Sequence, residues 1–161
     1  MESGQMTDDG WQDSMTCRTL ESPSELDFWG IGSEELNSLR VRDDQAGPVY
    51  DLEERTSIFG EKIILFAKKI PATPVNIRLI SQLVGAGTSL GANYCEADDG
   101  VSRADFKNRI GTCRKESRET KFFLRMIAVS EPKLTAEARE LWQEAHSFHR
   151  IFSRIWRSTK P

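Results

Sequence analysis

The fold is decided by residues 73–97, which read TPVNIRLISQLVGAGTSLGANYCEA. Apolar and small residues recur along this stretch at alternating steps of three and four, which is the spacing of one face of an α-helix. One row consists of Ile77, Ile80, Val84, Gly87, Gly91 and Tyr94, and a second row consists of Leu79, Leu83, Ala86 and Leu90. Thr73 as N-cap and Pro74 at the first helical position predict where the helix begins. Because it has two apolar rows, we expect this helix to lie at the centre of a bundle or between subunits.

The same spacing occurs three more times. It predicts helices over residues 51–70, 102–130 and 135–157, with Asp51, Ser102 and Thr135 as their N-caps. No stretch shows the apolar–polar alternation of a β-strand. Four long helices joined by short links indicate an all-α fold, an antiparallel up-and-down four-helix bundle that occupies residues 51–161.

Residues 1–50 differ from this helical body in charge. They hold 3 Lys or Arg and 11 Asp or Glu, whereas residues 51–161 hold 19 and 14. The overall net charge of −3 is therefore the sum of an acidic arm at −8 and a body at +5. The arm has no sustained apolar period, so burial cannot offset the entropy of ordering it, and we expect it to be largely disordered. Within it, residues 26–31 (LDFWGI) are either stray solvated aromatics or a short docking segment.

Several classes of protein are excluded at this stage. No run of about 18 apolar residues occurs, so we expect neither a membrane span nor a membrane partner. The N-terminus has no basic and apolar regions like those of a secretory signal. Three cysteines, Cys17, Cys95 and Cys113, form an odd and sparse set without a Cys-x-x-Cys motif. This usage disfavours a disulfide framework or a zinc site and predicts a cytoplasmic location.

We expect no catalytic residues, no metal and no cofactor. Di-metal bundles carry Glu-x-x-His pairs, whereas this chain has Glu116-x-x-Glu119 and His146-x-x-His149. No base is placed by the sequence to activate Cys95 or Cys113, so both are interpreted as small core residues. The protein is therefore predicted not to be an enzyme.

The glycine-rich segment of the second helix resembles a phosphate loop only superficially. Its glycines continue the helical period and no Lys follows them, whereas a phosphate loop leaves the helix to expose its N–H groups. Each helical glycine costs about 1 kcal/mol relative to Ala, and close approach of a neighbouring helix is the compensation we expect. Gly87, Gly91, Asn93 and Tyr94 are accordingly predicted to lie in helix packing or in an oligomer interface.

A basic stripe on the third predicted helix is the candidate binding surface. It consists of Arg103, Lys107, Arg114, Arg118, Lys121 and Arg125, which recur in phase with the core row. One interpretation is a solvated flank whose long stems cover apolar surface. The other is contact with the phosphate backbone of RNA or DNA, driven by charge and weakly sequence-specific. A tethered acidic arm has the charge to compete with phosphate for such a stripe.

Two motifs carry a family resemblance. They are residues 87–97 (GTSLGANYCEA) and residues 102–106 (SRADF) with 114–120 (RKESRET). Together they resemble the bacterial four-helix bundle proteins first noticed in intervening sequences of large-subunit ribosomal RNA genes, to which the accessory protein of diversity-generating retroelements is similar. The resemblance covers about residues 51–157. It implies a protomer that assembles into a ring-like homopentamer, and its retroelement relative binds nucleic acid and partners a reverse transcriptase.

These observations predict a non-enzymatic, homo-oligomeric scaffold. We expect it to contact nucleic acid, or a nucleic-acid-processing partner such as a reverse transcriptase, through the basic stripe. The alternative is a scaffold that binds only other proteins. Salt-dependent binding of RNA and DNA distinguishes the two.

Overall fold

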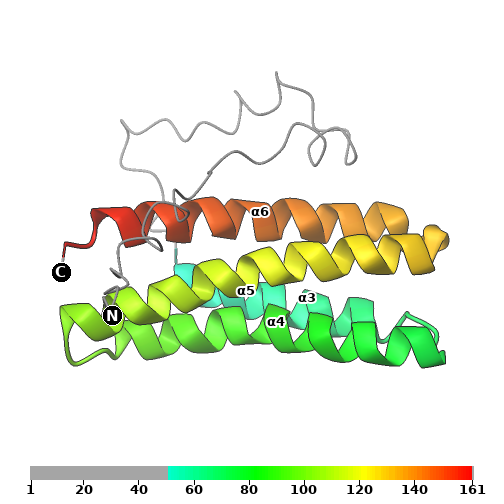
Figure 1. Ribbon diagram of the computed structural model, residues 1–161, viewed down its shortest axis with the longest axis horizontal. Helices are drawn as coiled ribbons and strands as arrows, with labels where there is room; N and C mark the ends of the chain where they lie inside the picture. The colour runs from blue at the N-terminus through cyan, green and yellow to red at the C-terminus, as the bar shows by residue number, and fades with distance from the viewer. Residues whose placement is uncertain (1–50, 161) are drawn as a thin grey trace, which may run out of the picture. The chain divides into compact units, whose positions relative to one another are not determined.

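The computed structural model describes residues 51–160, and these residues form four helices without a strand (Figure 1). The helices are α3 (Leu52–Ala67), α4 (Pro74–Asp98), α5 (Arg103–Ser130) and α6 (Thr135–Ser158), with a short 3₁₀ turn, η2 (Pro132–Leu134), before α6. Each runs antiparallel to the one before it, which confirms the predicted up-and-down bundle. The predictions for the acidic arm, including residues 26–31, lie outside the described residues.

Side-chain caps explain where three of the helices begin. Asp51, Thr73 and Ser102 each accept a hydrogen bond from the backbone N–H three residues later, at 3.1, 3.2 and 3.1 Å. Each bond satisfies one N–H that has no partner inside its helix. These three caps are the ones that the sequence predicts.

The start of α6 differs from the prediction. Thr135 is not a cap: Leu134 occupies that position and makes no side-chain cap bond, while Thr135 is already helical. Pro132 initiates the 3₁₀ turn instead, and the Thr135 hydroxyl donates to the Ala128 carbonyl of α5 at 3.4 Å. The 3₁₀ turn therefore leads the chain into α6, where the sequence predicted an N-cap at Thr135.

An aromatic cluster and aliphatic residues fill the centre of the bundle. Phe59 of α3 packs on Phe148 of α6 with ring centroids 5.3 Å apart, and Phe152 lies between Phe148 and Tyr94 of α4. The large aliphatic residues with no exposed surface are Ile63, Leu83, Leu90, Ile110, Leu124 and Ile127. Burial of each such side chain stabilises the fold by about 1.5–3 kcal/mol, so this core supplies most of the driving force.

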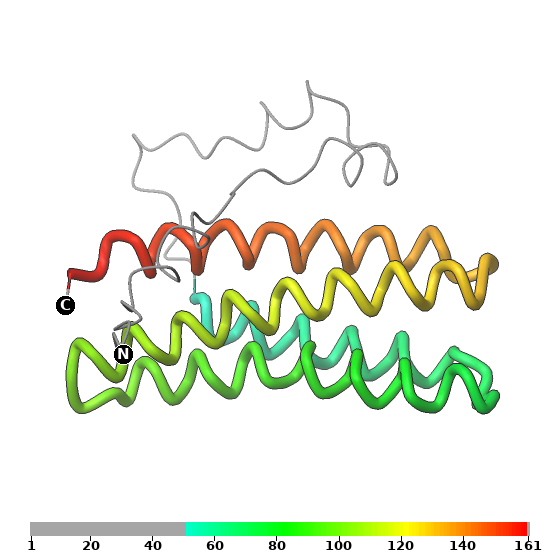
Figure 2. The backbone as a smooth tube through the Cα atoms, viewed as in Figure 1, coloured from blue at the N-terminus to red at the C-terminus, as the bar shows by residue number. Residues whose placement is uncertain are grey.

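The first helix is the shortest of the four, which leaves one end of the bundle with three helices. α3 has 16 residues, whereas the other three have 24 to 28. It was predicted to reach Ile70 but ends at Ala67, after which two tight turns still deliver the Ile70 side chain to the core. Figure 2 shows that α3 begins well inside the end where α4 meets α5. At that end, α4, α5 and α6 pack without a fourth partner among the described residues.

The two apolar rows of α4 have different surroundings. Leu83, Ala86 and Leu90 of the second row are buried in the core. The first row begins on the surface, where Ile77 is 58% exposed, and only later turns toward α3 at Gly87. The contact expected on a second side of α4 is therefore made, at Gly87, by α3 of the same chain.

Candidate nucleic-acid interface

The predicted basic stripe follows the seam between α5 and α6. Arg103 and Arg118 are exposed, and Lys107, Arg114 and Arg125 are half-buried. Lys107 and Arg114 lie over Trp156 of α6. Long basic side chains at such a seam bury their stems and leave their charged ends near solvent. The stripe is thus partly structural. Of its members, only Arg103 and Arg118 are exposed, so it is not a continuous charged row on the surface.

Lys121 does not belong to the exposed stripe. Only 4% of the residue is exposed, and its Nζ lies 4.8 Å from the centre of the Trp142 ring and 3.5 Å from Nδ1 of His146. A phosphate group cannot reach an ammonium group enclosed in this way. The prediction that Lys121 contacts nucleic acid does not fit this burial, which α6 provides through Trp142 and His146.

A row of aromatic and polar residues on α6 receives the basic side chains. The row consists of Trp142, His146, His149, Ser153 and Trp156, at steps of four, three, four and three. Arg114 donates from Nε to the Ser153 hydroxyl at 3.2 Å and lies over the Trp156 ring at 4.6 Å. Lys107 lies over the same ring at 5.0 Å. Such cation–π contacts stabilise by about 0.5–2 kcal/mol and fix the seam.

The aromatic row of α6 was not predicted, although its spacing is visible in the sequence. His146, His149 and Trp156 each come one residue after an apolar residue of α6 (Ala145, Phe148 and Ile155). They therefore repeat with the same helical spacing as the apolar residues. A row of imidazole and indole rings in phase with a cationic row on the next helix indicates cation–aromatic pairing. The pairing became evident only once α5 and α6 were known to be neighbours.

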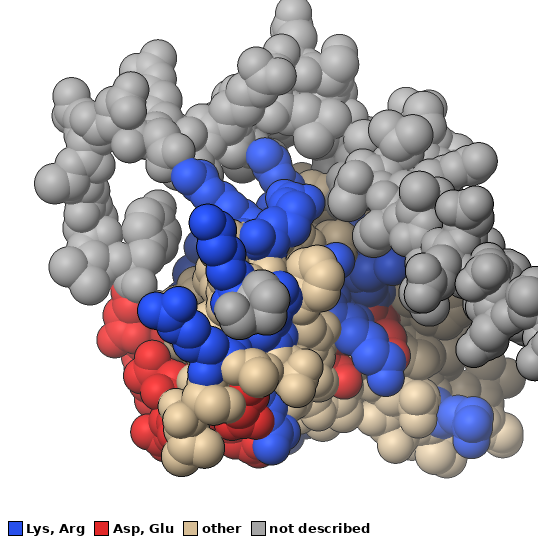
Figure 3. Space-filling model, turned by 60° about the vertical axis from the view of Figure 1, so that its left-hand side comes forward, with Lys and Arg blue, Asp and Glu red and all other residues tan. Residues whose placement is uncertain are grey.

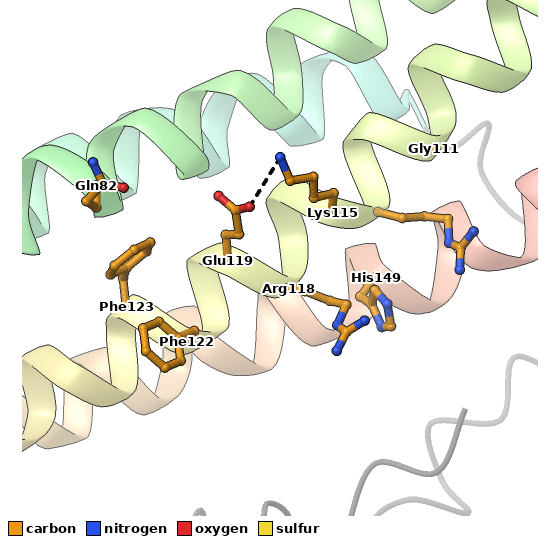
Figure 4. A pocket seen from close by; sticks show the side chains of 9 residues that line it. Gln82, Gly111, Lys115, Arg118, Glu119, Phe122, Phe123 and His149 are labelled. Atoms are coloured by element: carbon orange, nitrogen blue, oxygen red, sulfur yellow. Dashed lines mark ion pairs between the residues drawn. The ribbon is translucent and has the colours of Figure 1, made fainter. Parts of the chain in front are cut away.

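Beside the seam lies a groove of about 670 Å³. Its walls include Gln82 of α4, Arg114, Arg118, Phe122 and Phe123 of α5, and His149 of α6. In Figure 4 the Arg118 side chain lies next to His149, while Phe123 projects toward Gln82. An ion pair between Lys115 and Glu119, at 3.5 Å, lies at the edge of this groove. The groove therefore combines cations with aromatic rings, which the sequence had not placed together.

Positive charge is concentrated around the three-helix end. Figure 3 shows many Lys and Arg side chains on the surface there, with Asp and Glu side chains below them and at places beside them. Arg103 of α5 and Arg150, Arg154 and Arg157 of α6 are exposed and belong to the elements that meet at this end. Separation of charge over a protein surface raises the local concentration of an oppositely charged ligand.

Gly87, Gly91 and Tyr94, three of the predicted packing residues of α4, lie against other helices of the same chain. A Cβ at Gly87 would lie 2.9 Å from Ile63 of α3, and one at Gly91 would lie 3.4 Å from the Thr56 hydroxyl. Tyr94 is partly buried against Phe152 of α6, and burial, followed by the charge of Asp98, raises its pKa. Asn93 bonds only within its own helix, from Nδ2 to the Ser89 carbonyl at 2.8 Å, so it does not join two helices.

The remaining titratable groups show no arrangement for metal chemistry. Within residues 51–160, no three His, Cys, Asp or Glu side chains are placed to hold a metal ion. Burial, with the charge of Glu119, raises the pKa of Glu116, and burial raises that of the Cys113 thiol to about 12. No helix in this part of the chain is long and apolar enough to cross a membrane.

The chain is similar to the solved structure of a protein of unknown function from the S23 ribosomal protein family from Bacteroides thetaiotaomicron VPI-5482. The two share 26% sequence identity with a TM-score of 0.60, and the match covers 66% of this chain and 99% of the other. Comparison with protein-family models and with curated proteins finds no match. The likeness confirms the helical bundle.

Proposed function

We propose that this protein is a non-enzymatic, oligomeric four-helix bundle scaffold that contacts nucleic acid, or a nucleic-acid-processing partner such as a reverse transcriptase. The observation that supports this most is the exposed positive charge of Arg103 and Arg118 on α5 and of Arg150, Arg154 and Arg157 at the adjoining end of α6. Such a surface releases counterions when it meets a phosphate backbone. The similar solved structure comes from a family named for a ribosomal protein, which agrees with an RNA partner.

Exposed apolar residues support self-association. Large aliphatic side chains are exposed on the first two helices: Ile58, Ile64, Leu65, Val75 and Ile77 are between 39% and 66% exposed. Apolar side chains repeated over neighbouring elements favour a protein interface, since water gains freedom when they are covered. A homo-oligomer, as in the pentameric family that the sequence resembles, would multiply the basic surface and raise its affinity.

A charge-reversal experiment tests the proposal. Arg103→Glu/Arg118→Glu is compared with Lys62→Glu/Arg78→Glu, which makes the same change in net charge at exposed positions on α3 and α4. Binding of RNA and DNA is measured by fluorescence anisotropy over a range of salt concentrations, together with the mass in solution.

We expect the α5 variant to lose affinity and to lower the salt slope by about 2, because each lost phosphate contact contributes about 0.9. The α3/α4 variant should retain the wild-type slope. Absence of binding by the wild-type chain at low salt would contradict the proposal and favour the scaffold that binds only proteins. A monomeric mass would contradict the oligomeric part alone.

A further inference from the structure

The groove beside the α5–α6 seam contains an aromatic ring, that of Phe122, which is not part of the hydrophobic core. Phe122 is 55% exposed, whereas the rings of Phe59, Phe66, Phe148 and Phe152 are at most 1% exposed. Phe123 supports it edge-on, with centroids 5.2 Å apart and planes at 80°. This contact fixes the Phe122 ring and leaves area for a ligand, so the ring forms a small stacking platform in the wall of the groove.

Cations lie next to this platform on the same helix. Arg118 is one helical turn before Phe122, on the same face, and is exposed. Arg114 is one turn further back, and its guanidinium is already held over Trp156. The Glu119 carboxylate also lines the groove, but Lys115 lies 3.5 Å from it and offsets its charge. Over about 18 Å of helix from Gly111 to Phe123, the wall therefore places a charged segment, residues 114–119, directly beside the Phe122–Phe123 pair.

A cation one helical turn from an exposed ring matches an unpaired nucleic-acid strand. A base presents a flat π-face that stacks on an aromatic ring, and each nucleotide carries a phosphate for a neighbouring cation. In a duplex the base faces are covered by their neighbours in the stack, so Phe122 would have no face to contact. A second protein molecule would have to place a carboxylate against Arg118, because covering the groove would otherwise remove that charge from water without compensation.

We infer that this groove binds single-stranded nucleic acid, with one unpaired base stacked on Phe122 and a neighbouring phosphate on Arg118. The inference deepens the proposed function and rests on it, since it specifies which form of nucleic acid the basic surface takes. His149, which lies beside Arg118 at the groove, is positioned to line the path of the strand.

The test uses the full chain and three fluorescein-labelled probes: an oligothymidylate, an oligouridylate and a DNA hairpin with the same number of phosphates. Phe122→Ala should weaken binding of the single strands about 5- to 150-fold and leave the salt slope unchanged, because it removes stacking and no charge. Phe122→Trp should retain the affinity. Arg118→Ala should weaken all three probes and lower the salt slope by about 0.9.

Val129→Ala is the matched control, because Val129 is 68% exposed on the same helix and lies outside the groove. Equal affinity for hairpin and single strands, with Phe122→Ala unchanged, would overturn this inference and leave the proposed function in place. Failure of every probe to bind would remove both. A Phe122→Ala variant with a smaller mass in solution would show that a second copy covers the ring, which also overturns the inference.

Discussion

Gly87 of α4 lies against Ile63 of α3 so closely that a Cβ at position 87 would be 2.9 Å from both Cγ atoms of the isoleucine. Ile63 has no exposed surface, and its β-branched side chain cannot rotate away without entering the core. The separation of the two helices is therefore set by the absence of a side chain at this position. Gly85, two residues earlier on the same helix, has no atom within 4 Å of the corresponding point.

These two glycines give opposite predictions for the same substitution. Gly87→Ala should lower the free energy of unfolding by about 1–2 kcal/mol, because overpacking outweighs the gain in helix propensity. Gly85→Ala should raise it by about 0.4–1 kcal/mol, since only the propensity changes. Chemical denaturation followed by circular dichroism measures both. Equal effects of the two substitutions would show that α3 and α4 do not approach each other as described.

Asn76 connects the start of α4 to the end of α5. Its Nδ2 donates to the Pro71 carbonyl at 3.0 Å and to Glu131 at 2.7 Å, and its Oδ1 accepts from the Ser130 hydroxyl at 2.6 Å. Asn76→Ala should cost about 1–3 kcal/mol of stability, because the residue has no exposed surface and its partners lose their bonds. Asn108→Ala, at an exposed position of α5, is the control and should change stability by less than about 0.5 kcal/mol. Similar denaturation midpoints for the two variants would contradict this role.

Lys121 and Arg118, three residues apart, should respond differently to loss of charge. Lys121→Met keeps the length of the buried stem, so we expect unchanged or greater stability and no change in the salt slope of nucleic-acid binding. Lys121→Ala should lose about 2 kcal/mol because it leaves a cavity. Arg118→Ala should leave stability unchanged and lower the slope by about 0.9. A lower slope for Lys121→Met would restore Lys121 to the binding surface.

Cys113 should be inert in the folded protein. Its thiol has a pKa of about 12, above the ordinary 9.0, because burial disfavours the thiolate. At pH 8 the thiolate fraction is then about 0.01%, against about 10% for an ordinary thiol, and the thiolate is the form that reacts. Iodoacetamide labelling followed by peptide mass spectrometry should modify Cys113 only after unfolding. Equal labelling with and without denaturant would contradict its burial.

The raised pKa also links Cys113 to stability at high pH. Its folded pKa lies above the unfolded value, so the folded state keeps the proton more tightly. This contribution is complete below pH 9.0 and is lost as the pH rises from 9.0 toward about 12. Denaturation midpoints measured across this range should therefore fall more steeply for the wild-type chain than for Cys113→Ala.

The helices were predictable because their signals are local. A cap such as Asp51 or Ser102 and a period of three and four residues depend only on neighbours along the chain, and the structure places both as expected. The predicted N-cap of α6, Thr135, was wrong for a reason that is also local: Pro132 starts a 3₁₀ turn before Thr135 is reached.

The candidate site was predictable only in part. The sequence placed Arg118 and Lys121 in one row, but their angular positions on the helix differ enough that α6 covers one and leaves the other in solvent. The groove was not predicted, because its walls come from Gln82, His149 and the Phe122–Phe123 pair on three different helices.

The sequence by itself determined four amphipathic helices, three of their caps and the separation of charge along the chain, because each depends on residues within a few positions of one another. Only the tertiary structure decided which basic side chains remain available. Lys121 is enclosed by Trp142 and His146, Arg114 is held by Trp156 and Ser153, and Arg118 faces the groove. The physical reason is that exposure depends on the neighbouring helix: Arg118 and Lys121 each directly follow a core residue of α5, but only Lys121 is buried against Trp142 and His146 of α6.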